Sequence, residues 1–149
     1  MSAKPSDQAA TLRELLRVLI RKLGILERSE AACCEITLSQ CHTLIEIGRA
    51  GALSVNELSD RLGLDKSTVS RSADKLVLDG LLLREEAAND RRYVSLKLTS
   101  KGNESYNALE QRMTDYFGTV ISSIDPAERE MVLKGLQSLT IALKSNKCC

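Results

Sequence analysis

Apolar residues recur every three or four positions over much of this chain, a spacing typical of amphipathic helices. The first such segment spans residues 12–26, where Arg and Glu separate the leucines. These leucines are Leu12, Leu15, Leu16, Leu19, Leu23 and Leu26. The pattern predicts a helix with one apolar face. Residues 29–36 break the pattern, so we expect the helix to end before them.

A capping box predicts the start of the next helix. Thr37 and Gln40 have the side chains that reciprocally bond the backbone N–H groups of a first helical turn. The helix is expected to run to about Arg49, and Gly48 and Gly51 are expected to help end it.

A pair of short helices should follow. Ser54 and Glu57 form a second capping box, and Gly63 supplies a turn. Asp65 is a favourable N-cap for the next helix, which should stop at Gly80. The apolar stripe of the first helix in this pair consists of Val55, Leu58 and Leu62.

Two strand-like runs come next, Leu81–Glu85 and Tyr93–Leu98. Both are rich in Leu, Val and Tyr, and the polar link between them contains Asn and Asp, so they predict a β-hairpin. Two helices should complete the chain, the first capped by Thr99-Ser100 and the second beginning at Asp125-Pro126. Their apolar stripes are Tyr106, Leu109, Met113, Phe117, Val120 and Ile124, and then Val132, Leu136, Leu139 and Leu143. The expected fold is mainly α with one small β-hairpin (α+β), in a single domain spanning residues 1–149.

Composition narrows the class of protein. The chain of 149 residues has a net charge of +1, so any basic surface must be local. Residues 49–101 hold ten Lys and Arg against eight Asp and Glu, a small surplus of 10 − 8 = +2. No apolar run approaches the roughly 20 residues of a membrane span, and the N-terminus lacks the apolar core of a signal peptide. We expect a cytoplasmic protein that does not associate with membranes.

The helix expected after Asp65 has two distinct faces at 100° per residue. Its apolar face comprises Val69, Ala73, Leu76 and Val77, and its polar face comprises Ser67, Ser70, Arg71, Asp74 and Lys75. The polar face can enter a DNA major groove, because short hydroxyls allow close approach to base edges and Arg71 can reach guanine or phosphate. Backbone N–H groups of the first turn are expected to meet phosphate. The carboxylate of Asp74 would be repelled by DNA phosphates unless Lys75 or Arg71 compensates its charge.

The hairpin tip strengthens this interpretation. Arg91 and Arg92 end a strand pair and are placed to enter an adjacent minor groove, where the narrow channel favours guanidinium groups. Asp90 could orient one of these arginines by a charge-assisted hydrogen bond. A helix-turn-helix followed by a basic hairpin predicts a protein that grips double-stranded DNA in two grooves.

Nearly the whole chain resembles the MarR-type winged helix-turn-helix transcriptional regulators. The resemblance is carried by the order and spacing of several segments. These are Ile36-Thr37-Leu38-Ser39-Gln40, Leu53-Ser54-Val55-Asn56-Glu57-Leu58, Asp65-Lys66-Ser67-Thr68-Val69-Ser70-Arg71, Leu76-Val77-Leu78-Asp79-Gly80-Leu81, Asn89-Asp90-Arg91-Arg92 and Leu98-Thr99-Ser100-Lys101-Gly102. In such a protein Ser67, Thr68, Ser70 and Arg71 match the recognition helix, and Asp90 with Arg92 matches the Asp-x-Arg pair of the wing.

The resemblance also implies a homodimer that reads a palindromic operator, with the first and last helices of the two chains interlocked. Residues 8–48 and 103–149 would form the helical dimerisation region, and 49–102 the winged helix-turn-helix region. The leucine-rich helices favour a dimer independently, because they carry more apolar surface than one small winged domain can cover. Repression is the family's commoner mode of regulation.

Five cysteines are the candidate sensor: Cys33, Cys34, Cys41, Cys148 and Cys149. Their odd number and the missing secretion signal favour reduced thiols over a disulfide framework. Thiolates suit As(III), Hg, Cd, Zn or Cu ions, or oxidants, so DNA affinity switched by thiol chemistry is the leading hypothesis. In the other interpretation, Cys41 is a small core residue, Cys33 and Cys34 form a partly buried loop pair, and the last two cysteines belong to a tail.

Two alternatives stay open. Many members of this family accept phenolic ligands in a cavity near the position of Cys41, although one Phe, three Tyr and no Trp make an aromatic-lined pocket less favourable here. The chain could also be a protein-interaction module or a thiol- or metal-handling protein without DNA binding. An enzyme is not expected, because His42 is the only histidine and no catalytic motif is present.

Overall fold

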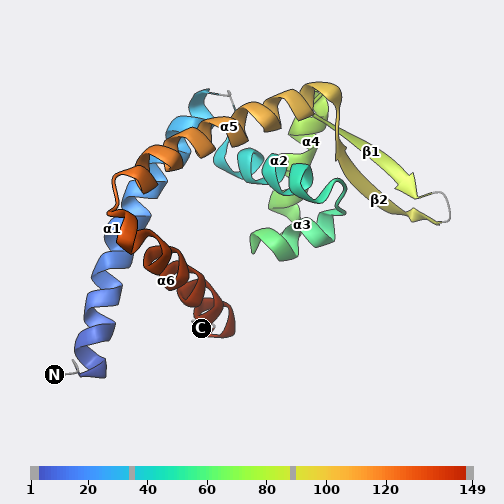
Figure 1. The fold of residues 1–149 in the computed structure, drawn as a ribbon. Coiled ribbons are helices and arrows are strands. Elements are labelled where there is room, and N and C mark those ends of the chain that lie inside the picture. Colours follow the sequence, from blue (N-terminus) through green and yellow to red (C-terminus); the bar gives the residue numbers. More distant parts are fainter. Residues whose placement is uncertain (1–3, 34–35, 88–89, 147–149) are drawn as a thin grey trace. The chain divides into compact units, whose positions relative to one another are not determined.

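The computed structural model describes residues 4–33, 36–87 and 90–146, which form six helices and one two-stranded sheet (Figure 1). The elements are α1 (Pro5–Cys33), α2 (Leu38–Ala50), α3 (Val55–Leu62), α4 (Lys66–Leu78), β1 (Leu82–Ala87), β2 (Asp90–Leu98), α5 (Ser100–Ser122) and α6 (Pro126–Ser145). The predicted mainly α fold with a single hairpin is confirmed.

The chain divides into two compact units, Met1–Leu109 and Glu110–Cys149. The first unit contains every element from α1 to β2 and the start of α5. The second contains the rest of α5 and α6. That residues 1–149 act as one domain stays a prediction.

Local capping fixes the helix starts in the first unit. Thr37 accepts a hydrogen bond from the Gln40 N–H at 3.2 Å, and the Gln40 side chain accepts one from the Thr37 N–H at 2.8 Å. Ser54 and Glu57 make the same reciprocal pair before α3. Gly63 ends α3 in the left-handed conformation (φ 63°), which glycine adopts without a steric penalty. Both predicted capping boxes are therefore confirmed.

One hydrophobic core joins α2, α3, α4, the hairpin and the start of α5. Its most deeply buried apolar side chains are Leu44, Ile47, Leu58, Val69, Leu76, Leu82, Leu96 and Leu109. The hairpin is antiparallel, and Leu53 adds a short bridge to Leu96 on β2. Because every one of these elements contributes to the same core, α4 and the hairpin are held in a fixed relationship.

Two sequence expectations were wrong. The first helix does not end before residue 29 but continues to Cys33, because residues 27–33 are mostly Glu, Arg and Ala, which favour a helix without an apolar stripe. Gly48 does not end α2 but lies inside it. A Cβ atom there would lie 2.5 Å from the Tyr106 ring, so Gly48 permits close packing of α5, while Gly51 (φ 83°) caps α2.

Candidate nucleic-acid interface

The helix α4 is anchored by one face and exposed on the other. Val69, Ala73 and Leu76 are buried, together with Ser72. The hydroxyls of Ser72 and Ser39 on α2 share a 2.7 Å hydrogen bond, so the back of α4 is joined to α2 by a polar contact as well as by packing. Ser67, Arg71, Asp74 and Lys75 are exposed, and Thr68 and Ser70 are half-buried. The buried and exposed faces of α4 are those that the sequence pattern predicts, and Ser72 joins the buried face.

The first turn of α4 is organised by Asp65. Its carboxylate accepts hydrogen bonds from the Ser67 hydroxyl at 2.5 Å, the Thr68 hydroxyl at 2.6 Å and the Thr68 N–H at 2.8 Å. The Ser67 hydroxyl is the largest cause of a pKa of Asp65 far below its usual range, followed by the Thr68 hydroxyl and N–H. The expectation that first-turn N–H groups meet phosphate is wrong for Thr68, because the Asp65 carboxylate already occupies that N–H.

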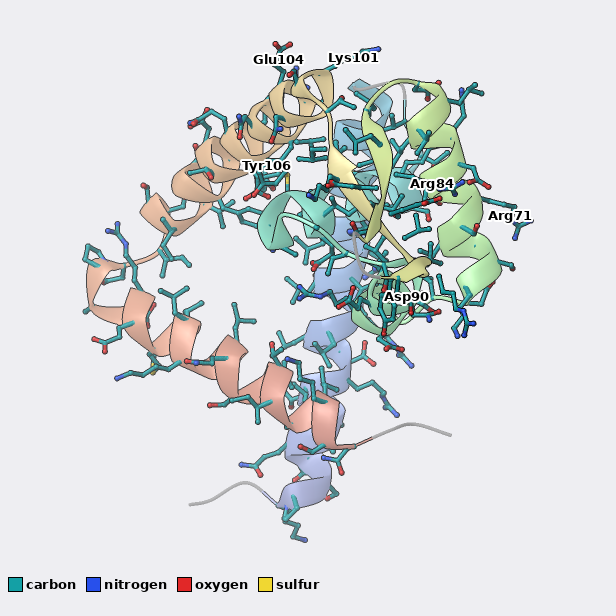
Figure 2. All side chains as sticks on the ribbon, turned by 90° about the vertical axis from the view of Figure 1, so that its right-hand side faces the viewer. Arg71, Arg84, Asp90, Lys101, Glu104 and Tyr106 are labelled. Carbon is teal, nitrogen blue, oxygen red and sulfur yellow. The ribbon has the colours of Figure 1, made fainter. Side chains whose placement is uncertain are left out.

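Basic side chains on α4 differ in their partners. Arg71 projects outward from α4 (Figure 2), and its Nε donates to the Ser67 carbonyl at 3.3 Å. This bond positions the guanidinium beside the first turn. Lys75 instead forms a 2.7 Å ion pair with Asp79 at the end of the helix. Arg71 is therefore better placed than Lys75 to contact a ligand of α4.

Asp74 is compensated by a residue that the sequence reasoning missed. Arg84 on β1 forms an ion pair and hydrogen bond with Asp74, so neither Lys75 nor Arg71 has this role. Both members of the pair are about half-exposed, and its contribution to the stability of the fold is correspondingly small. Its consequence is geometric, because it ties the exposed face of α4 to the first strand of the hairpin. No sequence pattern indicates that Arg84 lies next to Asp74, because the two meet only where β1 packs beside α4.

The hairpin is held to the end of α4 and to the start of α5. Thr99 donates its hydroxyl to the Gly80 carbonyl at 2.6 Å and its N–H to the Leu81 carbonyl at 3.1 Å. Lys101 donates to the Asp79 carbonyl at 3.0 Å. These bonds fix the base of the hairpin to α4.

At the hairpin tip, Asp90 accepts a hydrogen bond from the Arg92 N–H at 3.0 Å. This bond goes to the backbone of Arg92 and shapes the chain at the tip, and the expectation that Asp90 orients an arginine side chain stays a prediction. Arg92 is exposed. The side chain of Arg91 and residue Asn89 lie outside what the structure describes, so the predicted role of Arg91 stays a prediction.

Between the start of α3 and the hairpin lies an open groove of about 570 Å³. It is bordered by Arg84 and Arg92, and by Glu57 and Asp60 from α3. Hydrogen bonds from the Ser54 N–H and hydroxyl lower the pKa of Glu57, so this carboxylate is ionised at neutral pH. The groove therefore has mixed charge, because Arg84 and Arg92 face two carboxylates of α3.

Comparisons with known proteins agree with this geometry. The profile of the MarR family matches residues 35–92. The chain is 25% identical to a MarR family protein from Bacillus stearothermophilus of known structure, covering 95% of this chain and 99% of that one with a TM-score of 0.84. It is also 25% identical to Streptococcus pneumoniae FabT in complex with DNA, covering 94% and 99% of the two chains with a TM-score of 0.81. A third relative, the transcriptional repressor MdtR of Bacillus subtilis, is 32% identical over 103 residues, or 67% of this chain and 65% of MdtR.

This chain belongs to the MarR family.

As a MarR-family protein it is a DNA-binding transcriptional regulator with the winged-helix fold, in which α4 has the position of the recognition helix and β1 with β2 that of the wing. Curated relatives from Clostridium symbiosum and Bacillus subtilis are named as HTH-type transcriptional regulators. Among the helices that the structure describes, none combines the length and apolarity needed to cross a membrane.

Of the cysteines in this MarR-family chain, Cys41 alone has a described side chain. It is 5% exposed and lies within the hydrophobic core on α2. Cys33 is the last residue of α1, but its side chain lies outside the description, as do Cys34, Cys148 and Cys149 entirely. Among the described residues, no group of three His, Cys, Asp or Glu side chains could hold a metal ion.

Proposed function

We propose that this regulator is a homodimeric repressor that binds a palindromic operator, with α4 in the major groove and the wing in the adjacent minor groove. One observation carries the proposal. The apolar face of α4 is buried in the core while Ser67, Ser70 and Arg71 stay accessible on the opposite face, and the wing carrying Arg92 is fixed to the same helix by Asp74 and Arg84. An anchored helix with a polar outer face and a basic wing matches the shape of two neighbouring DNA grooves.

The residues divide into two roles. Arg71 can donate two parallel hydrogen bonds to a guanine edge or bind phosphate, and Ser67, Thr68 and Ser70 are short enough for base edges. Lys75 would contact phosphate after leaving Asp79. Arg91 and Arg92 would enter the minor groove, and Asp90 would shape the wing tip.

Exposed apolar side chains support the dimer. They gather on the helices outside the winged-helix region: Leu12, Leu15, Val18, Leu19 and Ile20 on α1, Tyr116, Phe117 and Val120 on α5, and Met131, Leu133, Leu136, Ile141 and Leu143 on α6. Every residue of α6 is at least partly exposed. A single chain would leave these stripes in water, whereas a second copy would cover them.

Fluorescence anisotropy tests DNA binding directly. Labelled DNA from the gene's own upstream region is titrated with wild type, Arg71→Ala, Arg92→Ala and the control Lys134→Ala, which removes the same charge from α6. Loss of one base-contacting arginine should weaken binding about 5- to 150-fold, corresponding to about 1–3 kcal/mol. Equal affinity for all four proteins would contradict the assignment and favour a protein-interaction module. Light scattering coupled to size exclusion tests the dimer. Added protein should reduce transcription in vitro from a template that carries the operator only if the protein represses.

We further propose that thiol chemistry switches the DNA affinity. One observation favours α2 as the relay: Cys41 lies on the same helix as Ser39, whose hydroxyl bonds Ser72 on the back of α4. Displacement of α2 by a thiophilic metal ion, by As(III) or by oxidation of neighbouring thiols would therefore move the recognition helix. A shift of a few ångströms in the spacing of the two recognition helices suffices to lose contacts in both half-sites.

Arsenite added to the reduced protein–DNA complex tests the switch. The variant Cys33→Ser/Cys34→Ser/Cys41→Ser should bind DNA normally and ignore arsenite, and Cys41→Ser alone separates the buried thiol from the other two. DNA release that persists in the triple variant would refute the switch at these positions. Release by salicylate but not by arsenite or oxidants would support the phenolic-ligand alternative.

A further inference from the structure

The first turn of the recognition helix contains an unusual concentration of hydrogen bonds on one carboxylate. Ser67 and Thr68 both direct their hydroxyls to Asp65, at 2.5 and 2.6 Å. The same two hydroxyls belong to the face that would meet DNA. Their bonding to Asp65 therefore determines what they can offer to a base.

The chemistry of the three groups fixes the position of the hydrogens. An ionised carboxylate only accepts hydrogen bonds, and a hydroxyl has one hydrogen to donate and two lone pairs that accept. The lowered pKa of Asp65 keeps this carboxylate ionised at neutral pH. The single hydrogen of each hydroxyl must therefore point to Asp65, and only oxygen lone pairs remain on the outer side.

We infer that Asp65 makes Ser67 and Thr68 obligatory hydrogen-bond acceptors, so that the bases they contact must be adenine or cytosine and not guanine or thymine. This inference rests on the proposed function of α4 in the major groove. There, adenine and cytosine present an amino group, whereas guanine and thymine present carbonyl oxygens at the equivalent edge. A serine or threonine hydroxyl without such a partner can serve either kind of base.

A hydroxyl could escape this restriction only by breaking its bond to Asp65. That bond has a charged acceptor, and charge-assisted hydrogen bonds are roughly twice as strong as neutral ones. Rotation toward a guanine or thymine oxygen would exchange the stronger bond for a weaker one. It would also leave a carboxylate with fewer partners close to the phosphates.

Neighbouring residues on the face supply a contrast. Arg71 uses Nε for the Ser67 carbonyl and keeps its terminal guanidinium nitrogens as donors, so it suits guanine or phosphate. Ser70 lies one residue before Arg71, and its hydroxyl is not bonded to Asp65. The face would thus present acceptors at Ser67 and Thr68 and donors at Arg71.

Selection of binding sites from randomised duplex DNA tests the inference. Wild type, Ser67→Ala, Thr68→Val and Asp65→Asn are each used at the same salt concentration. Asparagine still caps the helix, but its amide NH₂ donates, so at least one hydroxyl hydrogen is released. Some positions of the selected DNA site should lose their base preference in Ser67→Ala or Thr68→Val. Wild type should select adenine or cytosine at these positions, and Asp65→Asn should enrich guanine or thymine there. The control Asp125→Asn makes the same change at the N-cap of α6 and should select the wild-type site.

A second measurement does not depend on the stability of Asp65→Asn. In the selected site, unsubstituted purine replaces the relevant adenine, or 2-pyrimidinone the cytosine, which removes only the amino group facing the major groove. The affinity of wild type for the modified site should fall about fivefold or more, which is within the usual range for one defective base pair. The affinity of Ser67→Ala or Thr68→Val should be the same for the modified and the unmodified site. Guanine or thymine at the hydroxyl-dependent positions, or an unchanged wild-type affinity, would overturn the inference. Failure of wild type to enrich any sequence would instead overturn the proposed DNA-binding role of α4.

Discussion

Replacing Gly102 by alanine should damage the junction between the wing and α5. Gly102 is buried in the first turn of α5, where its N–H donates to the Thr99 hydroxyl at 3.0 Å. A Cβ atom at this position would lie 1.9 Å from the Leu81 carbonyl oxygen and 2.9 Å from its carbon. Both obstructing atoms belong to the backbone, so no side-chain rotation can relieve the contact.

The expected loss of stability can be worked from these distances. A carbon and a carbonyl oxygen normally approach to about 3.3 Å, so the chain must yield by about 1.4 Å. The same carbonyl accepts the 3.1 Å hydrogen bond from the Thr99 N–H, which such a shift would break. Overpacking costs about 1–3 kcal/mol and the lost bond about 1 kcal/mol, while alanine in a helix returns about 1 kcal/mol. The net destabilisation should be about 2 kcal/mol.

Thermal unfolding followed by circular dichroism measures this effect. For a chain of this length, about 2 kcal/mol corresponds to a fall in Tm of roughly 4–8 °C. Gly118→Ala is the matched control, because Gly118 lies in the same helix and a Cβ there meets nothing within 4 Å. Both proteins must be compared at one concentration, since a dimer's Tm depends on it. A Tm for Gly102→Ala equal to or above that of Gly118→Ala would refute the reasoning.

Three other changes have definite expected outcomes. Ser72→Ala removes the bond between Ser72 and Ser39 and should cost about 1 kcal/mol in urea unfolding; an equal urea midpoint would mean that the bond contributes nothing. Gly48→Ala should cost about 1–3 kcal/mol because of the Tyr106 ring, and the cost should shrink in a Tyr106→Leu background; persistence of the full cost would point to another contact. The lowered pKa of Asp65 stabilises the fold above the unfolded-state pKa of about 3.9, and this stabilisation is lost as pH falls below about 4. The difference in urea midpoint between wild type and Asp65→Asn should therefore be larger at pH 7 than at pH 3, and a constant difference would contradict the assigned bonds.

Local signals in the sequence predicted the helix starts and the two faces of α4. The capping boxes at Thr37 and Ser54 and the cap at Asp65 involve residues at most three positions apart, so their chemistry can be read directly from the chain. The periodic apolar positions of α4 are likewise local, and Val69 and Leu76 are buried as expected.

Contacts between distant segments could not be predicted in the same way. Asp74 and Arg84 are ten positions apart and meet only because β1 returns beside α4, and Ser39 and Ser72 are separated by 33 positions. Gly48 read as a helix terminator because its role depends on the ring of Tyr106 in another helix. Each case requires knowledge of which elements pack together, which no short sequence pattern contains.

The acidic residues around the DNA-binding surface have a common arrangement. Asp65 binds two hydroxyls and an N–H, Asp74 binds Arg84, and Asp90 binds the Arg92 N–H. Each carboxylate would repel DNA phosphates if left alone, yet each instead holds a part of the recognition helix or the wing in position. In a chain of net charge +1, nonspecific attraction to DNA is weak, so affinity must come from correctly placed contacts. In the proposed complex, the acidic residues would therefore contribute to recognition by fixing the directions of two hydroxyls on α4, of the Arg84 guanidinium and of the backbone at the wing tip.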